Sequence, residues 1–229
     1  MKTVQLMVDK TIAYVLGHKN FKTLGCSRTD AMVSADDFAF EIFCFQQLEV
    51  DFLNKFNENL PPDIKALAID DVDEDFNIIK SAKLKEYHYQ FSFGKKNHPF
   101  NAPFITHFHG SLDIELMQAG ARLFEGTHNF HAYCYQPGEK TVFVREILKS
   151  EIIANPFRAD FAPPTSFVFC VKGAGFLRYQ VRIMMGTLIE LGKGNIDLEQ
   201  FKNTLVDNSL PIGPVAPASG LVLHKVDFL

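Results

Sequence analysis

The sequence alternates strongly in a run of residues from Lys83 to Phe93. Successive side chains of a β-strand point to opposite faces of a sheet, so this alternation predicts one long strand. The two predicted faces differ in character, with Leu84, Glu86, His88, Gln90 and Ser92 on one and Lys85, Tyr87, Tyr89, Phe91 and Phe93 on the other. The strand constrains the fold strongly because it needs neighbouring strands with which to pair.

The basic residues of this strand allow two interpretations. Lys83, Lys85 and His88 lie close in sequence to two tyrosines, a combination suited to contacting phosphates and bases. The same pattern is also typical of an ordinary strand that has aromatic residues in the core and lysines at its edge. The sequence alone leaves both open.

Periodicity and turn residues predict the other elements. The apolar face from Val4 to Leu16 predicts a helix, with Thr3 as its N-cap and Gly17 as its end. Further strands are predicted at 20–26, 37–46, 64–69, 142–153, 166–172 and 221–228, and further helices at 48–60, 112–124, 176–191 and 198–206. The loop over 94–110 is taken as the boundary between two domains, 1–94 and 95–229.

Composition bounds the class of protein. The chain has 229 residues, 47% of them hydrophobic and 22% charged, which is typical of a soluble globular protein. Its net charge of −4 and pI of about 6.1 do not indicate nucleic-acid binding, although a local basic groove is compatible with an acidic protein.

The cysteines and the hydropathy suggest a cytoplasmic protein. Cys26, Cys44, Cys134 and Cys170 are widely scattered, which favours reduced core thiols over a disulfide framework or a zinc site. No apolar run reaches the ~18 residues of a transmembrane helix, so we expect no membrane span.

Arg28 and Asp30 lie in a loop between two predicted strands. Loops held by rigid strands often carry catalytic groups, and this one presents a carboxylate beside a guanidinium. The alternative is that Asp30 caps a turn and Arg28 is a surface charge. Spacing alone does not decide between them, because Arg-x-Asp is a very short pattern.

Two arginines lie in the predicted helix over 176–191, which is otherwise apolar. Arg178 and Arg182 are four residues apart and are expected on one helix face. An arginine in apolar surroundings needs a carboxylate or phosphate partner. Elsewhere, His107 and His109 invite a metal interpretation, but no third ligand has a persuasive spacing, and we predict no metal site.

Six segments together resemble one family. The first, Arg28–Ala35 (RTDAMVSA), is similar to the signature R-T-D-x-G-V-H-A of the tRNA pseudouridine synthase A (TruA) family. The others, in the family's order, are Asn57–Ile64 (NENLPPDI), Lys85–Tyr89 (KEYHY), Gly126–Phe130 (GTHNF), Gly173–Thr187 (GAGFLRYQVRIMMGT) and Ala216–Leu223 (APASGLVL). The resemblance extends over nearly the whole chain.

The resemblance implies a fold and an activity. Members of the family are α+β proteins of the pseudouridine synthase fold, with two similar halves of mainly antiparallel sheets flanked by helices around a central basic cleft. They are isomerases that convert uridine to pseudouridine in the anticodon stem-loop of tRNA, at tRNA positions 38–40. They work as homodimers and without a cofactor, so the partners we expect are tRNA and a second copy of the chain.

The resemblance also implies roles for particular residues. It places the catalytic carboxylate at Asp30, its arginine partner at Arg182 and the base-stacking tyrosine at Tyr87, while Arg28 helps to displace the target base. The carboxylate is suited to acting as a nucleophile or as a base on the sugar, and both roles stay open. For contacts with the RNA we expect Arg28, Thr29, Lys83, Lys85, Lys95, Lys96 and Arg178.

The signature loop departs from the family pattern at two positions. Met32 stands where the pattern has glycine, and Ser34 stands where it has histidine. If the glycine position requires positive φ, methionine strains the loop. The chain also begins at the helix that follows the family's opening strand, so we expect either a truncated product or a sheet edge that is covered in another way.

These departures motivate a second hypothesis. The chain would then be a TruA-like RNA-binding protein with weak or no catalytic activity. A hydrolase is not favoured, because no second carboxylate lies in a comparable loop and glycosidase chemistry normally needs two.

Overall fold

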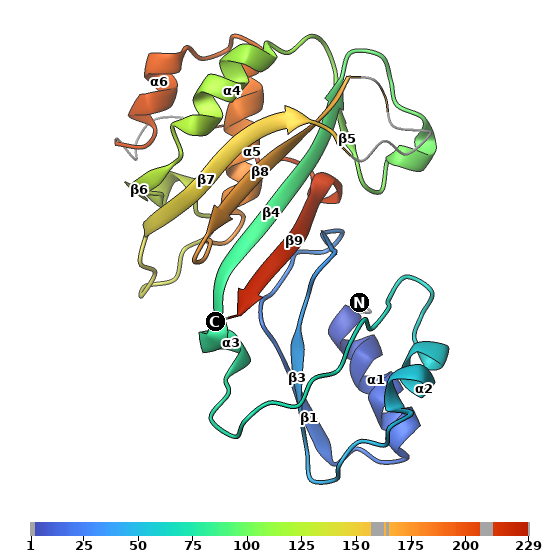
Figure 1. The fold of residues 1–229 in the computed structure, drawn as a ribbon. Coiled ribbons are helices and arrows are strands. Elements are labelled where there is room, and N and C mark those ends of the chain that lie inside the picture. Colours follow the sequence, from blue (N-terminus) through green and yellow to red (C-terminus); the bar gives the residue numbers. More distant parts are fainter. Residues whose placement is uncertain (1–2, 157–162, 164, 207–212, 229) are drawn as a thin grey trace. The chain divides into compact units, whose positions relative to one another are not determined.

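The strand predicted over Lys83–Phe93 is present as β4 (Ala82–Phe93), the longest strand of the described chain. In this computed structural model, which describes residues 3–156, 163, 165–206 and 213–228, β4 lies inside a seven-stranded sheet (Figure 1). The order across the sheet is β2 (Ser34–Ala35), β9 (Leu221–Phe228), β4, β8 (Ser166–Gly173), β7 (Val144–Ala154) and β6 (Gly126–Asn129). The short strand β5 (Thr106–Phe108) pairs parallel to the end of β4.

Most of the strand pairs are antiparallel. β4 with β8, β8 with β7 and β7 with β6 are antiparallel, whereas β2 with β9 and β4 with β5 are parallel. The described chain is therefore an α+β protein with a mixed, mostly antiparallel sheet, which confirms this part of the predicted fold class.

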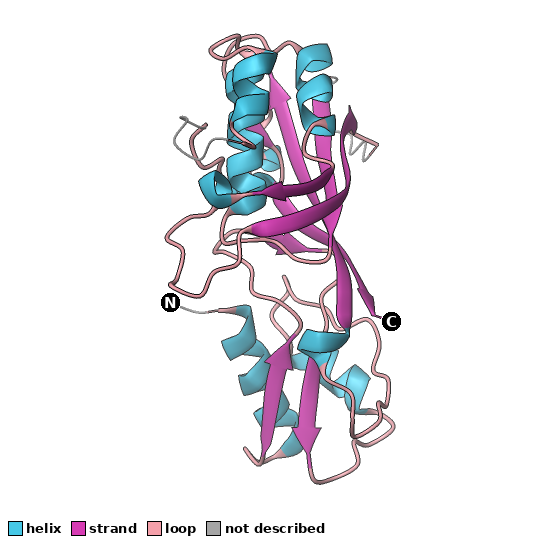
Figure 2. Ribbon diagram, turned by 90° about the vertical axis from the view of Figure 1, so that its left-hand side faces the viewer, coloured by secondary structure: helices cyan, strands magenta, loops and turns pink. Residues whose placement is uncertain are grey.

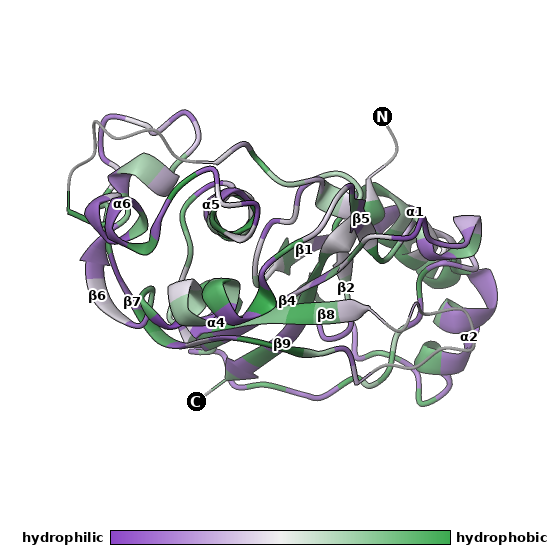
Figure 3. Ribbon diagram, turned by 90° about the horizontal axis from the view of Figure 1, so that it is seen from above, coloured by the Kyte–Doolittle hydropathy of each residue, from purple (hydrophilic) through white to green (hydrophobic). Residues whose placement is uncertain are grey.

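Three helices cover one face of the sheet. They are α4 (Ile114–Arg122), α5 (Gln180–Gly192) and α6 (Leu198–Asn203), and they lie on the same side of the strands (Figures 2 and 3). Phe124 lies at the centre of the packing between them, with its ring centroid 6.4 Å from that of Phe169 on β8 and 5.1 Å from that of Phe201 on α6. We call this side the helix face and the other side the opposite face.

The register of β4 divides its side chains between these faces. Tyr89 pairs with Phe169 and Tyr87 pairs with Val171, so both tyrosines belong to the helix face. Glu86 and His88 therefore belong to the opposite face. This division agrees with the two sets of alternating residues in the sequence.

The chain forms two compact units. One comprises Met1–Arg28 and Phe38–Ala82, and the other comprises Thr29–Asp37 and Lys83–Leu229. The predicted boundary between residues 94 and 95 falls within the second unit. The segment that carries Asp30 also belongs to the second unit, together with the sheet and its helices.

The first unit contains α1 (Val4–Leu16), β1 (Phe21–Gly25), β3 (Phe40–Cys44), α2 (Phe52–Asn59) and α3 (Ile78–Ser81). β1 and β3 form an antiparallel pair, and the core consists of Val8, Ile12, Phe52 and Phe56. The caps predicted for α1 are confirmed: Leu6 N donates to Thr3 Oγ1 (3.1 Å), and Gly17 ends the helix with φ of 72°.

The prediction of a buried strand at 64–69 was wrong. This segment has no regular secondary structure, and Leu67 is exposed. The Asn57 side chain occupies both backbone groups of Ala66, accepting from its N–H (2.8 Å) and donating to its carbonyl (2.9 Å). The segment is thus held by a side chain instead of by a neighbouring strand.

Two other boundaries differ from prediction. The helix predicted from Phe176 begins only at Gln180, because Tyr179 adopts a left-handed φ of 62°. The loop predicted over 94–110 contains β5, whose pairing with β4 is non-local and leaves no periodic pattern in three residues.

The thiols and the helices agree with the expectations from composition. All four cysteines are free, and burial raises the pKa of Cys170 to about 12, which keeps that thiol protonated. Among the residues described by the structure, no helix combines the length and the apolar character needed to cross a membrane.

Candidate active site

Asp30 and Arg182 form an ion pair within the second unit. Arg182 Nη1 donates to Asp30 Oδ2 at 2.8 Å, although the two residues are 152 positions apart. The Arg182 side chain is 13% exposed and that of Asp30 is 31% exposed. A guanidinium with this little access to water requires a charged partner, and Asp30 supplies it while remaining open to solvent.

Two further contacts fix the Arg182 guanidinium. Its Nε donates to the Ala216 carbonyl at 2.8 Å, and the Ala216 N–H donates back to the Arg182 carbonyl at 3.0 Å. Its central carbon lies 4.6 Å from the ring centroid of Tyr179, within the range of a cation–π interaction. The guanidinium is therefore fixed at its Nε, and its Nη1 is aimed at Asp30 in a defined direction.

Two glycines bring the Ala216 segment against α5. A Cβ on Gly186 would lie 1.7 Å from the Pro214 carbonyl oxygen, and a Cβ on Gly213 would lie 2.2 Å from the Gly186 carbonyl carbon. Only residues without side chains permit this approach of two backbones. The Gly213 N–H also donates to Thr187 Oγ1 (3.2 Å), which holds the crossing in place.

The loop that carries Asp30 contains the strained position expected from the sequence. Val33 N donates to the Asp30 carbonyl at 3.2 Å, which closes a turn with Met32 as its third residue. Met32 has φ of 69° and is exposed. The position therefore has the backbone conformation that favours glycine, and methionine adopts it at a cost.

The other end of this loop is anchored to β9. Ser34 and Ala35 form β2 opposite Val222 and Leu223, and Asp36 N donates to the Leu223 carbonyl at 2.9 Å. Ser34, which replaces the histidine of the family signature, is thus part of a strand pair. Asp30 is held on one side by Arg182 and on the other by this short strand.

Tyr87 lies on the helix face of β4 and is 8% exposed. Its ring meets that of Phe176 edge to face, with the centroids 5.2 Å apart. Tyr89, two residues along the same face, bonds through its hydroxyl to the Pro217 carbonyl (2.8 Å) and Thr106 Oγ1 (3.0 Å). Burial raises the pKa of Tyr89, and the hydrogen bond with Thr106 and the Arg182 charge oppose this shift.

Arg178 lies outside α5, contrary to the predicted shared helix face with Arg182. It is exposed, its guanidinium carbon lies 5.4 Å from the ring centroids of both Tyr135 and Tyr179, and it donates to Gln136 Oε1 (3.4 Å). The two tyrosine rings stack at 4.8 Å with an interplanar angle of 18°. Arg178, Tyr135 and Tyr179 thus form an aromatic–cation group that reaches Arg182 through Tyr179.

Tyr135 and Tyr179 were not singled out from the sequence. Tyr179 had a detectable signal, because it lies between two arginines in an apolar segment. Tyr135 had none, since it lies in an irregular aromatic segment and meets Tyr179 only through the tertiary fold.

The predicted RNA-binding lysines fall at different places. Lys83 and Lys85 share the helix face of β4 with Tyr87, at the beginning of the strand. Lys95 and Lys96 are exposed just beyond its other end, and roughly 25 Å of strand separates Lys85 from Phe93 at about 3.3 Å per residue. These lysines cannot all contact one phosphate, but they can contact several phosphates along an extended RNA backbone.

Two of the predicted residues come before Asp30. Thr29 is exposed and begins the segment that belongs to the second unit, whereas Arg28 is exposed and belongs to the first.

His107 and His109, which invite a metal interpretation in the sequence, have ring centroids 5.2 Å apart. They are not part of any group of three metal-ligating side chains in the described chain.

Comparison with known proteins defines the class to which this arrangement belongs. A family model described as tRNA pseudouridine synthase matches residues 121–229. These residues include the Arg182 helix, its Ala216 contact and strand β9.

Relatives match almost the whole chain. A tRNA pseudouridine synthase A 2 of Bacillus cereus is 31% identical over 229 residues, covering 99% of this chain and 89% of the relative. A tRNA pseudouridine synthase A of a Geobacillus strain is 30% identical over 227 residues, covering 98% and 88%. One from Thermodesulfovibrio yellowstonii is 29% identical over 230 residues, covering 98% and 90%. The chain belongs to the tRNA pseudouridine synthase A family.

The strain at Met32 gives a first prediction. Replacing Met32 by glycine removes the left-handed penalty of about 1–2 kcal/mol and adds about 0.5–1 kcal/mol of backbone entropy cost. We expect Met32→Gly to raise the free energy of unfolding by about 0.5–1 kcal/mol in urea titrations followed by circular dichroism. Ala31→Gly, at a neighbouring position without positive φ, is the control and should destabilise the protein. If Met32→Gly and Ala31→Gly lower the free energy of unfolding equally, the backbone at Met32 is not strained.

The Tyr179 ring beneath Arg182 gives a second prediction. A cation–π contact is worth about 0.5–2 kcal/mol, so Tyr179→Ala should lower kcat/KM for pseudouridine formation in tRNA about 2- to 30-fold. Tyr179→Phe keeps the ring over which Arg182 lies and should retain most of the activity. If Tyr179→Phe and Tyr179→Ala reduce kcat/KM equally, the Tyr179 ring does not act on Arg182.

Proposed function

We propose that the protein isomerises uridine to pseudouridine in the anticodon stem-loop of tRNA, at tRNA positions 38–40, with Asp30 as the catalytic carboxylate. The observation that carries the proposal is the 2.8 Å ion pair between Asp30 and Arg182, which lie in two of the segments that resemble the family. Membership of the tRNA pseudouridine synthase A family supports the substrate and the reaction type.

The reaction needs one carboxylate and no co-reactant. The bond between C1′ of the ribose and N1 of uracil breaks, the uracil turns in the site, and C5 bonds to C1′. The proton on C5 is then lost and N1 gains one, so the product is an isomer of the substrate. Asp30 acts on the ribose, as a nucleophile at C1′ or as a base, while the detached uracil stays enclosed.

Arg182 is proposed as the group that pairs with the Asp30 carboxylate and orients it. Nε of Arg182 is held by the Ala216 carbonyl, and the Tyr179 ring limits its movement. The Asp30 carboxylate is thereby held in one orientation, in which its second oxygen, Oδ1, faces the substrate.

The target nucleotide must leave its helical stack, at a cost of a few kcal/mol. We assign Tyr87 to the wall beside the extruded base, on the helix face of β4 that it shares with Tyr89. The stacked pair of Tyr135 and Tyr179 offers an additional aromatic surface, and Tyr135 is 39% exposed. Stacking on such rings is worth about 1–3 kcal/mol per base.

The remaining contacts are proposed for the RNA backbone. Arg28 and Thr29, next to the catalytic carboxylate, would displace the base and hold its phosphate. Lys83 and Lys85 at one end of β4, Lys95 and Lys96 at the other and Arg178 beside the tyrosines would follow the strand of the stem-loop. We further propose the two similar halves, the basic cleft between them, the homodimer and the cytoplasmic location that the family resemblance implies, with no cofactor.

A tritium-release assay tests the function. The substrate is tRNA labelled at C5 of uridine, from which each isomerisation releases tritium to water. We expect turnover by the unmodified protein and at least about a 100-fold lower rate for Asp30→Asn, since positioned acid–base groups contribute about 10²–10⁴-fold. Binding of tRNA, measured in parallel, should change less than threefold.

Asp71→Asn provides the matched control, because Asp71 is an exposed aspartate of the first unit. Its rate should equal that of the unmodified protein. If the unmodified protein releases no more tritium than Asp30→Asn on any tRNA tried but still binds tRNA, the enzyme proposal fails. The second candidate function, an RNA-binding protein without turnover, would then hold. The observation that favours it is the strained Met32 in the Asp30 loop.

A further inference from the structure

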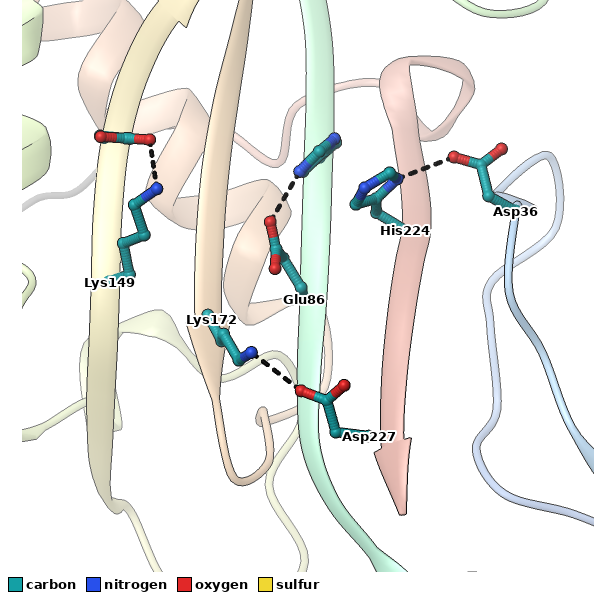
Figure 4. A network of polar contacts seen from close by, with 8 residues as sticks. Asp36, Glu86, Lys149, Lys172, His224 and Asp227 are labelled. Atoms are coloured by element: carbon teal, nitrogen blue, oxygen red, sulfur yellow. Dashed lines mark hydrogen bonds and ion pairs between the residues drawn. The ribbon is translucent and has the colours of Figure 1, made fainter. Parts of the chain in front are cut away.

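Four polar side chains gather on the opposite face of the sheet, away from α4, α5 and α6. Glu86 and His88 are two residues apart on β4, His224 lies on the neighbouring strand β9, and Asp36 directly follows β2. Figure 4 shows Glu86, His224 and Asp36 on this face, with the helices behind the strands. We call these four residues the Glu–His cluster.

The hydrogen bonds of the Glu–His cluster orient its rings. His88 Nε2 lies 2.9 Å from Glu86 Oε1, and His224 Nδ1 lies 3.0 Å from Asp36 Oδ2. The two imidazoles stack with centroids 3.8 Å apart and an interplanar angle of 16°. Glu86, His88 and His224 each offer one ligand atom, and these three atoms lie within 4.8 Å of one another.

Three members of the cluster are largely withdrawn from water, whereas the Asp36 side chain is 60% exposed. The side chains of His88, Glu86 and His224 are 11%, 22% and 32% exposed. Nδ1 of His88 is buried and has no hydrogen-bond partner in the described part of the chain. A buried ring nitrogen without a partner is unusual in a folded protein and calls for an explanation.

The nearby lysines are engaged elsewhere. On the same face, Lys172 pairs with Asp227 at 2.8 Å and Lys149 pairs with Glu151 at 2.6 Å (Figure 4). Neither of these lysines therefore neutralises Glu86.

We infer that the Glu–His cluster binds one divalent transition-metal ion of the Zn²⁺ class, with Glu86, His88 and His224 as ligands. Two imidazoles and one carboxylate are a ligand set that zinc accepts, and a water molecule completes four-coordination. Asp36 accepts from Nδ1–H of His224 at 3.0 Å, the arrangement by which carboxylates commonly orient metal-binding histidines.

Binding requires a small rearrangement of the two rings. A metal ion lies in the plane of each imidazole that binds it, and two nearly parallel rings cannot both point at the same ion. One ring must turn about its Cβ–Cγ bond, and the ligand atoms, which now lie within 4.8 Å of one another, must come to about 3.3 Å, as metal–ligand distances of about 2.0–2.1 Å demand.

The position of the site separates it from the reaction. His88 and Tyr87 are adjacent on β4 but point to opposite faces, so the ion would lie behind the sheet from the candidate active site. Through Asp36 the ion would secure the end of the Thr29–Asp37 segment, which carries the catalytic carboxylate, to β9 and β4. The inferred role is structural, and it does not depend on the proposed activity.

Metal titration of the tag-free, full-length protein tests the inference. After removal of metals with a chelator, isothermal titration with ZnCl₂ should show one tight site per chain, and Zn²⁺ should raise the Tm. His88→Gln and His224→Gln should each weaken the affinity at least tenfold, and Asp36→Asn should weaken it about tenfold, as orienting carboxylates typically do. Circular dichroism checks that each variant folds.

His109→Gln is the matched control, because it removes a histidine of the other close pair. It should leave the Zn²⁺ affinity and stoichiometry unchanged. Absence of a stoichiometric site in the unmodified protein overturns the inference, whatever the variants do. Binding that survives both His88→Gln and His224→Gln, or that is lost in His109→Gln, overturns it as well.

Discussion

The ion pair between Asp30 and Arg182 is the contact on which the rest of the candidate site depends. α5 is buried along most of its length, and an arginine placed there must have its charge and its donors satisfied. The Ala216 carbonyl, the Tyr179 ring and the Asp30 carboxylate each meet one part of the guanidinium. The close crossing at Gly186 brings Ala216 to this contact. The short strand β2 brings the Asp30 loop to it.

β4 connects the two sites proposed for the protein. Its alternate side chains place Tyr87 and Tyr89 toward the helices and Glu86 and His88 toward the other side. β9, paired beside β4, supports the Asp30 loop through β2 and also contributes His224 to the Glu–His cluster. A single pair of strands thus fixes both the Asp30 loop and the inferred metal site.

Local sequence signals predicted the elements whose causes are local. The caps of α1, the alternation of β4 and the apolar pattern of β9 are examples, and their bounds agree closely with prediction. The errors have tertiary causes: Asn57 holds Ala66 in place of a strand, and the left-handed Tyr179 delays the start of α5. Asp30 and Arg182 were paired through family resemblance, whereas the Glu–His cluster depends on strand register, which no local pattern reveals.

The most direct test of the central contact is the single-turnover rate of Arg182→Lys. Lysine keeps the charge but cannot donate to Ala216 and Asp30 in the same geometry, nor lie flat on the Tyr179 ring. Loss of one charge-assisted hydrogen bond, worth about 1.5–3 kcal/mol, should slow pseudouridine formation about 10- to 100-fold, with tRNA affinity and circular dichroism unchanged. A rate within about threefold of the unmodified protein would contradict the account.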